Sequence, residues 1–72
     1  MTCIITMRSE TYAIRAQRAL SENGIRTGII KLDPDFSKKG CSYGLKIDCR
    51  HRAVVSRILN DRSIPFSDIK TL

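Results

Sequence analysis

The strongest structural signal in the chain is the stretch YGLKIDC at residues 43–49. Its apolar residues alternate with glycine, lysine and aspartate, and a period of two is typical of a strand with one buried face. Directly after it, residues 50–62 carry apolar positions at helical spacing, with arginines on the outer side. This pattern predicts a strand followed by a helix in the second half of the chain.

The first half of the chain has a similar pattern. Residues 2–7 form a short apolar run rich in β-branched residues, which predicts a strand, and residues 9–23 have helical spacing with Ser9 as a natural N-cap. Gly24 suits the left-handed position that ends a helix, and residues 25–32 favour a second strand. A last short strand is expected at residues 64–69, where a proline at the start suits a sheet edge.

The order strand, helix, strand, strand, helix, strand predicts an α+β fold, the ferredoxin-like two-layer βαββαβ sandwich. We expect a four-stranded antiparallel sheet in the order 4-1-3-2, with both helices on one face. Strands one and three would be central and parallel, which places Cys3 and Cys41 toward one end of the sheet and Cys49 at the opposite end. The core is expected to contain Leu20, Tyr43, Leu45, Ile47, Val54 and Ile58.

The length of 72 residues predicts a single domain over residues 1–72, too small to enclose a deep substrate cavity by itself. The sequence has no Ser/His/Asp set, paired carboxylates or phosphate-binding glycine pattern, so we expect a non-catalytic protein without a cofactor rather than an independent enzyme. No metal site is expected, because structural zinc needs about four paired Cys or His ligands. His51, the one histidine, is expected at the surface.

Thirteen basic and seven acidic residues give a net charge of +6, which attracts anions. Arginines on the two helices could form a basic surface, but the outward positions of the strand at residues 43–49 offer no ring on which a base could stack. Nucleic acid is therefore not the expected partner. Lys38, Lys39, Arg50 and Arg52 are candidates for binding an anion or a partner protein.

No apolar run approaches the ~18 residues of a membrane span, and the first residues lack the features of a signal peptide. We therefore expect a cytoplasmic protein without a membrane partner. Three cysteines are an odd number for an unexported chain, so a disulfide scaffold is not expected and free thiols are.

Cys41 is the first candidate for thiol chemistry. It lies where a polar loop meets a central strand, and Lys38 and Lys39 precede it. Nearby cations favour the thiolate, which makes the sulfur a better nucleophile and suits it to carry persulfide or selenide. The alternative is a half-buried structural cysteine.

Cys49 and Cys3 are secondary thiol candidates. Cys49 precedes a predicted helix and Arg50, which would acidify the thiol, but it also shares the apolar face of its strand and could be a packed core residue. Cys3 could approach Cys41 as a resolving thiol, or be a small apolar strand residue. Cys41 and Cys49 are roughly 26 Å apart along an extended strand at ~3.3 Å per residue, too far to form a disulfide within one chain.

Four segments together resemble the selenium/sulfur carrier-like family: CIIT at residues 3–6, YAIRA at 12–16, GI at 24–25 and GCSYGL at 40–45. The resemblance covers about residues 3–69. It implies a small domain that holds sulfur or selenium on a cysteine for delivery to an acceptor. That cysteine corresponds to Cys41 and the motif glycine to Gly44; many members have the glycine directly after the cysteine, whereas Ser42 and Tyr43 intervene here.

The function that we expect is therefore that of a sulfur/selenium carrier, with donor and acceptor proteins as partners. The alternative is a small ligand-binding or protein-interaction module, regulatory in role and without thiol chemistry, because domains of this fold serve many functions. The uncovered face of the sheet is expected to expose apolar residues from strands one and two. Exposed apolar patches usually mark contact surfaces, so we also expect a homodimer or an obligate partner.

Overall fold

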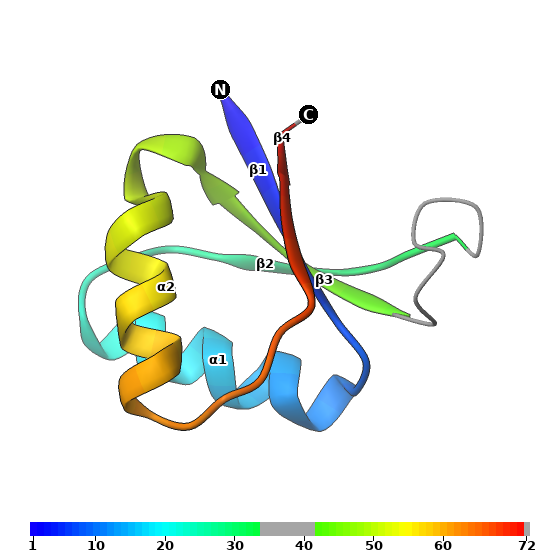
Figure 1. Ribbon diagram of the computed structural model, residues 1–72, viewed down its shortest axis with the longest axis horizontal. Helices are drawn as coiled ribbons and strands as arrows, with labels where there is room; N and C mark the ends of the chain where they lie inside the picture. Colours follow the sequence, from blue (N-terminus) through cyan, green and yellow to red (C-terminus); the bar gives the residue numbers. More distant parts are fainter. Residues whose placement is uncertain (34–41, 72) are drawn as a thin grey trace.

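The computed structural model describes residues 1–33 and 42–71 of the chain. These form a four-stranded antiparallel sheet in the order β2-β3-β1-β4, with the helices against it (Figure 1). The elements are β1 (Thr2–Met7), α1 (Glu10–Glu22), β2 (Gly28–Lys31), β3 (Tyr43–Asp48), the 3-10 turn η1 (Cys49–His51), α2 (Arg52–Asp61) and β4 (Asp68–Thr71). The α+β ferredoxin-like sandwich and its strand order are confirmed.

The two central strands run antiparallel, so the expectation that they are parallel is wrong. β1 pairs with β3 so that Cys3 lies opposite Ile47 and Met7 lies opposite Tyr43. The reason is the connection through α1, which brings the chain back so that β2 runs in the direction of β1, and β3 then reverses against β2. Cys3 therefore lies at the end of the sheet where β3 leads into Cys49, and not at the end near residue 42.

Helix α1 begins and ends as the sequence predicts. The Ser9 hydroxyl accepts a hydrogen bond from the backbone N–H of Thr11 at 3.1 Å, which satisfies one of the free amides of the first turn. At the other end Gly24 adopts φ 76°. The N–H of Ile25 then donates back to the carbonyl of Leu20 at 2.9 Å, the Schellman arrangement.

Helix α2 faces the core with a different residue from the one expected. The sequence has three consecutive apolar residues at 53–55, and successive positions of a helix are about 100° apart, so they cannot all face the sheet. Val55 and Leu59, four residues apart, are fully buried, whereas Val54 is 41% exposed. The expectation of a core Val54 is therefore wrong.

The second and fourth strands begin later than expected. Ile25 is buried, but β2 starts only at Gly28. Ile64 is also buried, its N–H bonded to the carbonyl of Leu59, yet the ladder of β4 runs from residue 68 to 71. Pro65 has no N–H to donate, and the backbone contact with β1 begins two residues later, where the N–H of Ser67 donates to the carbonyl of Thr6 at 2.9 Å.

The main core lies between the sheet and the helices. It joins Cys3, Ile5 and Met7 of β1 to the buried side chains of both helices, which places both helices on one face of the sheet. Leu20, Leu45 and Ile47 are buried as predicted, and Tyr43 and Ile58 are partly buried against this core.

A second, smaller apolar cluster lies on the opposite face of the sheet. Ile4 is 1% exposed and Leu32 8%, and Ile30 packs against them. The apolar residues of this face therefore bury one another within the chain, and less apolar surface is left there than we expected. In the described part of the chain, the large apolar residues that are exposed are Met1, Tyr12, Ile14 and Val54. Neither helix described is long and apolar enough to cross a membrane.

Candidate functional site

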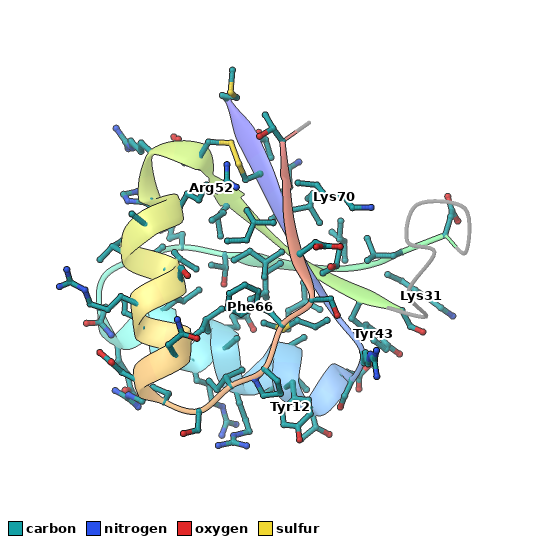
Figure 2. All side chains as sticks on the ribbon, in the orientation of Figure 1. Tyr12, Lys31, Tyr43, Arg52, Phe66 and Lys70 are labelled. Carbon is teal, nitrogen blue, oxygen red and sulfur yellow. A yellow bond between two sulfur atoms is a disulfide. The ribbon has the colours of Figure 1, made fainter. Side chains whose placement is uncertain are left out.

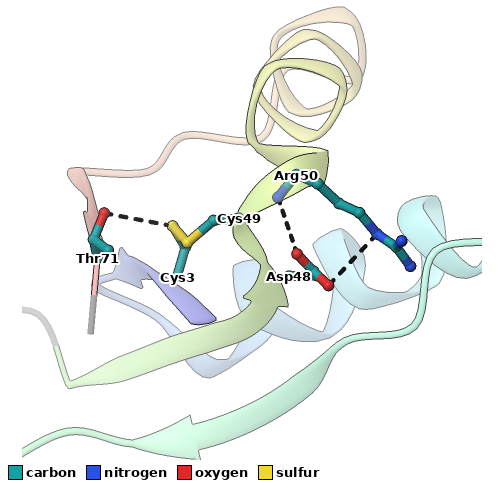
Figure 3. Close-up of a disulfide and its surroundings, with 5 residues drawn as sticks. All are labelled: Cys3, Asp48, Cys49, Arg50 and Thr71. Atoms are coloured by element: carbon teal, nitrogen blue, oxygen red, sulfur yellow. Dashed lines mark hydrogen bonds and ion pairs between the residues drawn. A yellow bond between two sulfur atoms is a disulfide. The ribbon is translucent and has the colours of Figure 1, made fainter. Parts of the chain in front are cut away.

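A disulfide joins Cys3 to Cys49 at one end of the sheet (Figure 3). The two residues are 46 positions apart in the sequence, and their Cα atoms are 5.0 Å apart. The antiparallel register explains the contact, because Cys3 lies opposite Ile47 and Cys49 follows two residues later. The expectation of free thiols is wrong for these two cysteines. The expected approach of Cys3 to Cys41 involves a residue that lies outside the described part of the chain.

The two bonded sulfurs have different surroundings. Cys3 is 0% exposed and belongs to the main core. Cys49 is only partly buried; it is the first residue of η1, and its N–H donates to the carbonyl of Met1 at 3.0 Å. Solvent therefore reaches the residue at the β3 end of the bond and not the one on β1.

Thr71 of β4 approaches the buried sulfur. It lies opposite Cys3 in the pairing of β1 with β4, and its Oγ1 is 3.7 Å from Sγ of Cys3. A disulfide sulfur carries no hydrogen, so the threonine hydroxyl is the donor in this contact. The buried end of the disulfide thus has a polar neighbour on the adjacent strand.

Asp48 fixes the turn that carries Cys49. Its Oδ1 accepts the backbone N–H of Arg50 at 3.0 Å, and its Oδ2 lies 3.5 Å from Nε of the same residue. The hydrogen bond from the Arg50 N–H, supported by nearby positive charges, lowers the pKa of the Asp48 carboxyl. Sequence reasoning missed Asp48 and Thr71, although an aspartate directly before a helical segment is a usual N-cap signal.

The four basic residues expected to bind an anion or a partner protein differ in their surroundings. Arg50 is exposed but has Asp48 as an ionic partner, which reduces its value as a site for a separate anion. Arg52 is exposed on the first turn of α2, toward the end of the molecule that holds the disulfide (Figure 2). Lys38 and Lys39 lie outside the described residues.

Cys41, the first thiol candidate, also lies outside the described residues. The structure describes the residues next to it: the carbonyl of Ser42 accepts the N–H of Leu32 at 2.8 Å, and Tyr43 pairs with Lys31. Tyr43 is at the opposite end of β3 from Cys49 (Figure 2).

Gly44, the motif glycine, has a steric role. It is fully enclosed in the sheet, and a Cβ placed on it would lie 2.8 Å from Cγ2 of Ile4 and 3.2 Å from Cδ2 of Leu32. These two residues occupy the space that a side chain at position 44 would fill. The glycine therefore allows the second apolar cluster to form.

Within residues 1–33 and 42–71, no three His, Cys, Asp or Glu side chains are grouped so that they could hold a metal ion. The described residues do hold a disulfide at one end of a small ferredoxin-like sheet. Together with a third cysteine in the sequence, this defines a small cysteine-bearing α+β domain.

A family model described as "Putative Se/S carrier protein-like" matches residues 2–70. The chain belongs to this family, as the sequence resemblance implied. Searches of curated proteins and of solved structures found no significant match.

Proposed function

We propose that the chain carries sulfane sulfur or reduced selenium on the thiol of Cys41 and delivers it to an acceptor protein. The observation that carries the proposal is the disulfide. The chain has three cysteines, and Cys3 and Cys49 are bonded to each other. Cys41 then has no other cysteine of the same chain with which to pair, and it is the thiol left to hold a cargo atom. The family description supports the class of cargo.

The position of Cys49 makes it a poor carrier even after reduction. A persulfide on Cys49 would have the thiol of Cys3 within bonding reach, since the two Cα atoms are 5.0 Å apart. The Cys3 thiolate would attack the inner sulfur, form the disulfide and release hydrogen sulfide. A carrier cysteine keeps its cargo best when no second cysteine is paired with it, and the pairing of Cys3 with Cys49 therefore favours Cys41.

Loading and delivery are two transfers of the same kind. The Cys41 thiolate attacks the outer sulfur or selenium atom of a donor persulfide or its selenium analogue, and the donor cysteine leaves as a thiolate. A nucleophile of the acceptor then attacks that outer atom and releases Cys41 as a thiolate. Lys38 and Lys39 favour the anionic form of Cys41 before loading and after delivery.

Donor and acceptor proteins with acidic surfaces fit this chain best, because its net charge of +6 attracts them. We also propose cytoplasmic action and assembly as a homodimer. The short edge strand β2 and the exposed Ile14 and Val54 of the helices are the surfaces that support association. Sedimentation at rising concentration tests the dimer, which a constant monomer mass would contradict.

The experiment for the carrier function is loading by a cysteine desulfurase with cysteine as substrate, followed by peptide mass spectrometry without reductant. We expect the mass of one added sulfur atom on the peptide that contains Cys41, and none in Cys41→Ser. A Cys49→Ser variant is the matched control and should load normally.

Two outcomes would contradict the proposal. Sulfur found on Cys49 and not on Cys41 would move the cargo site to the other end of β3. No sulfur on any cysteine, with a donor that loads itself, would favour the alternative of an interaction module without thiol chemistry.

A further inference from the structure

We infer that Cys3 and Cys49 form a second, redox-active site, which exchanges with external thiols through Cys49 and closes internally through Cys3. This inference goes beyond the carrier function and does not depend on it. The site takes small thiols and dithiols as reductants and small disulfides, of the glutathione class, as oxidants.

The difference in burial determines which sulfur exchanges. Thiol–disulfide exchange requires an incoming thiolate to approach one sulfur in line with the bond that breaks. Cys3 is 0% exposed within the main core, whereas Cys49 is partly buried at the start of η1. An external thiolate can therefore attack Cys49, and Cys3 is the sulfur that leaves.

Charge near Cys49 favours the approach of such a thiolate. Arg50, His51 and Arg52 follow directly in the sequence, and both arginines are exposed. Asp48 balances Arg50 through the 3.5 Å ion pair, so Arg52 adds net positive charge at this end of the sheet. Glutathione and similar thiols are anionic, and positive charge raises their local concentration.

Thr71 stabilises the departing sulfur. When the bond opens, Cys3 becomes a thiolate in the core, and a buried anion without a donor is costly. The hydroxyl of Thr71, 3.7 Å from Sγ of Cys3, already points a donor at that sulfur. Hydrogen bonds to an ionised acceptor are stronger than those between neutral groups, so the contact tightens as the charge develops.

The sheet keeps the two sulfurs close after reduction. β1 and β3 are joined by six residue pairs from Thr2↔Asp48 to Met7↔Tyr43, and the N–H of Cys49 donates to the carbonyl of Met1. These contacts are made by main-chain atoms and not by the sulfurs, so we expect them to persist when the disulfide opens. The dithiol therefore remains positioned to close again, which is what a reversible pair needs and a purely structural crosslink does not.

The cycle balances in atoms and electrons. In reduction, one thiolate of an external dithiol attacks Sγ of Cys49, Cys3 leaves as a thiolate and takes up a proton, and the second external thiolate then releases Cys49. In oxidation, the Cys49 thiolate attacks a small disulfide and frees one thiolate. Cys3 then loses its proton and attacks Sγ of Cys49, so that the intramolecular bond forms and the second external thiolate leaves. In the cytoplasm that the sequence predicts, disulfides are usually transient in this way.

The test uses the full chain with Cys41→Ser throughout, so that failure of the carrier function cannot affect the result. In this background the disulfide should open with dithiothreitol and close with glutathione disulfide while circular dichroism shows a folded chain. Cys3→Ser should leave a stable mixed disulfide between Cys49 and glutathione. In Cys49→Ser the remaining Cys3 should react with iodoacetamide at least about tenfold more slowly than Cys49 does in Cys3→Ser.

A second pair of variants tests the role of Thr71. Thr71→Val removes the hydroxyl and should slow reduction by about threefold to tenfold, whereas Thr71→Ser keeps it and should leave the rate unchanged. If Cys49→Ser does not fold, the same question is answered in the reduced Cys41→Ser chain by identifying which cysteine iodoacetamide modifies first. Modification of Cys3 first, equal rates, or reduction only in denaturant would overturn the inference.

Discussion

At one end of β3, Asp48 leads into Cys49, whose sulfur is bonded to the first strand. At the other end, Tyr43 and Ser42 lead back to Cys41, which has no remaining cysteine partner in the chain. One six-residue strand thus separates a cysteine that has a partner from one that has none. The two sulfur chemistries that we propose, cargo transfer at Cys41 and exchange at the Cys3–Cys49 disulfide, therefore belong to cysteines on either side of β3 in the sequence.

The largest effect on stability should come from reducing the disulfide between Cys3 and Cys49. Opening the Cys3–Cys49 disulfide, which links residues 46 positions apart, should lower the free energy of unfolding by about 3 kcal/mol, because the unfolded chain regains the entropy that the crosslink removed. Urea denaturation with and without reductant measures this loss. Cys41→Ser is the matched control and should unfold as the wild type does; equal stability of the oxidised and reduced chains would contradict the prediction.

A smaller loss of stability should come from placing a side chain at Gly44, near the other end of β3. Gly44→Ala places a Cβ 2.8 Å from Cγ2 of Ile4, so the second apolar cluster must shift, at a cost of about 1–3 kcal/mol. Gly28→Ala is the matched control, because its Cβ would meet only Cβ of Lys46 at 4.0 Å and should change stability by less than about 0.5 kcal/mol. Urea denaturation midpoints of the two variants measure the difference. Equal midpoints for Gly44→Ala and Gly28→Ala would contradict the steric role of Gly44.

A persulfide on Cys49 should also release hydrogen sulfide faster than a persulfide on Cys41. With the disulfide reduced and the reductant removed, the wild type exposed to a persulfide donor should release hydrogen sulfide about tenfold faster than Cys3→Ser, equivalent to about 1.4 kcal/mol in the barrier. The expected reason is that Cys3, which pairs with Cys49, attacks a persulfide on Cys49 and displaces hydrogen sulfide. A sulfide assay measures the release, and equal rates would show that Cys3 does not resolve persulfide.

The smallest expected effect concerns acid. The hydrogen bond from the Arg50 N–H and the nearby positive charges lower the pKa of Asp48 below its ordinary 3.8 in the folded chain. A carboxyl with a lowered folded pKa contributes stability above the unfolded value and loses it as the pH falls through the folded value. Below about pH 4 the wild type should therefore lose more stability than Asp48→Asn. Thermal unfolding across that range measures this, and parallel curves for the two proteins would contradict it.

Local signals in the sequence were sufficient for much of the fold. The alternation in β3 and the caps of α1 at Ser9 and Gly24 depend on residues near one another in the chain, and the structure confirms them. The relative direction of β1 and β3 depends instead on how the helical crossover returns the chain. An error in that direction placed Cys3 beside Cys41 and concealed the disulfide.

Local sequence patterns also could not predict which residues of α2 face the core or which side chains meet across the sheet. Three adjacent apolar residues do not determine which of them faces the core; we expected Val54, and packing in the folded chain buries Val55 instead. Thr71 lies beside Cys3 because of the register between β1 and β4. The residues around Thr71 in the sequence contain no pattern that predicts this contact.

The central position of β1 affects how the chain is made. β1 is synthesised before the strands that it pairs with, β3 at residues 43–48 and β4 at residues 68–71, so it has no strand partner until β3 emerges. Pairing between distant segments is slow and leaves apolar strands exposed meanwhile. Cys3, which is 0% exposed in the folded chain, is therefore open to oxidants and chaperones on the nascent chain until β3 and β4 have emerged.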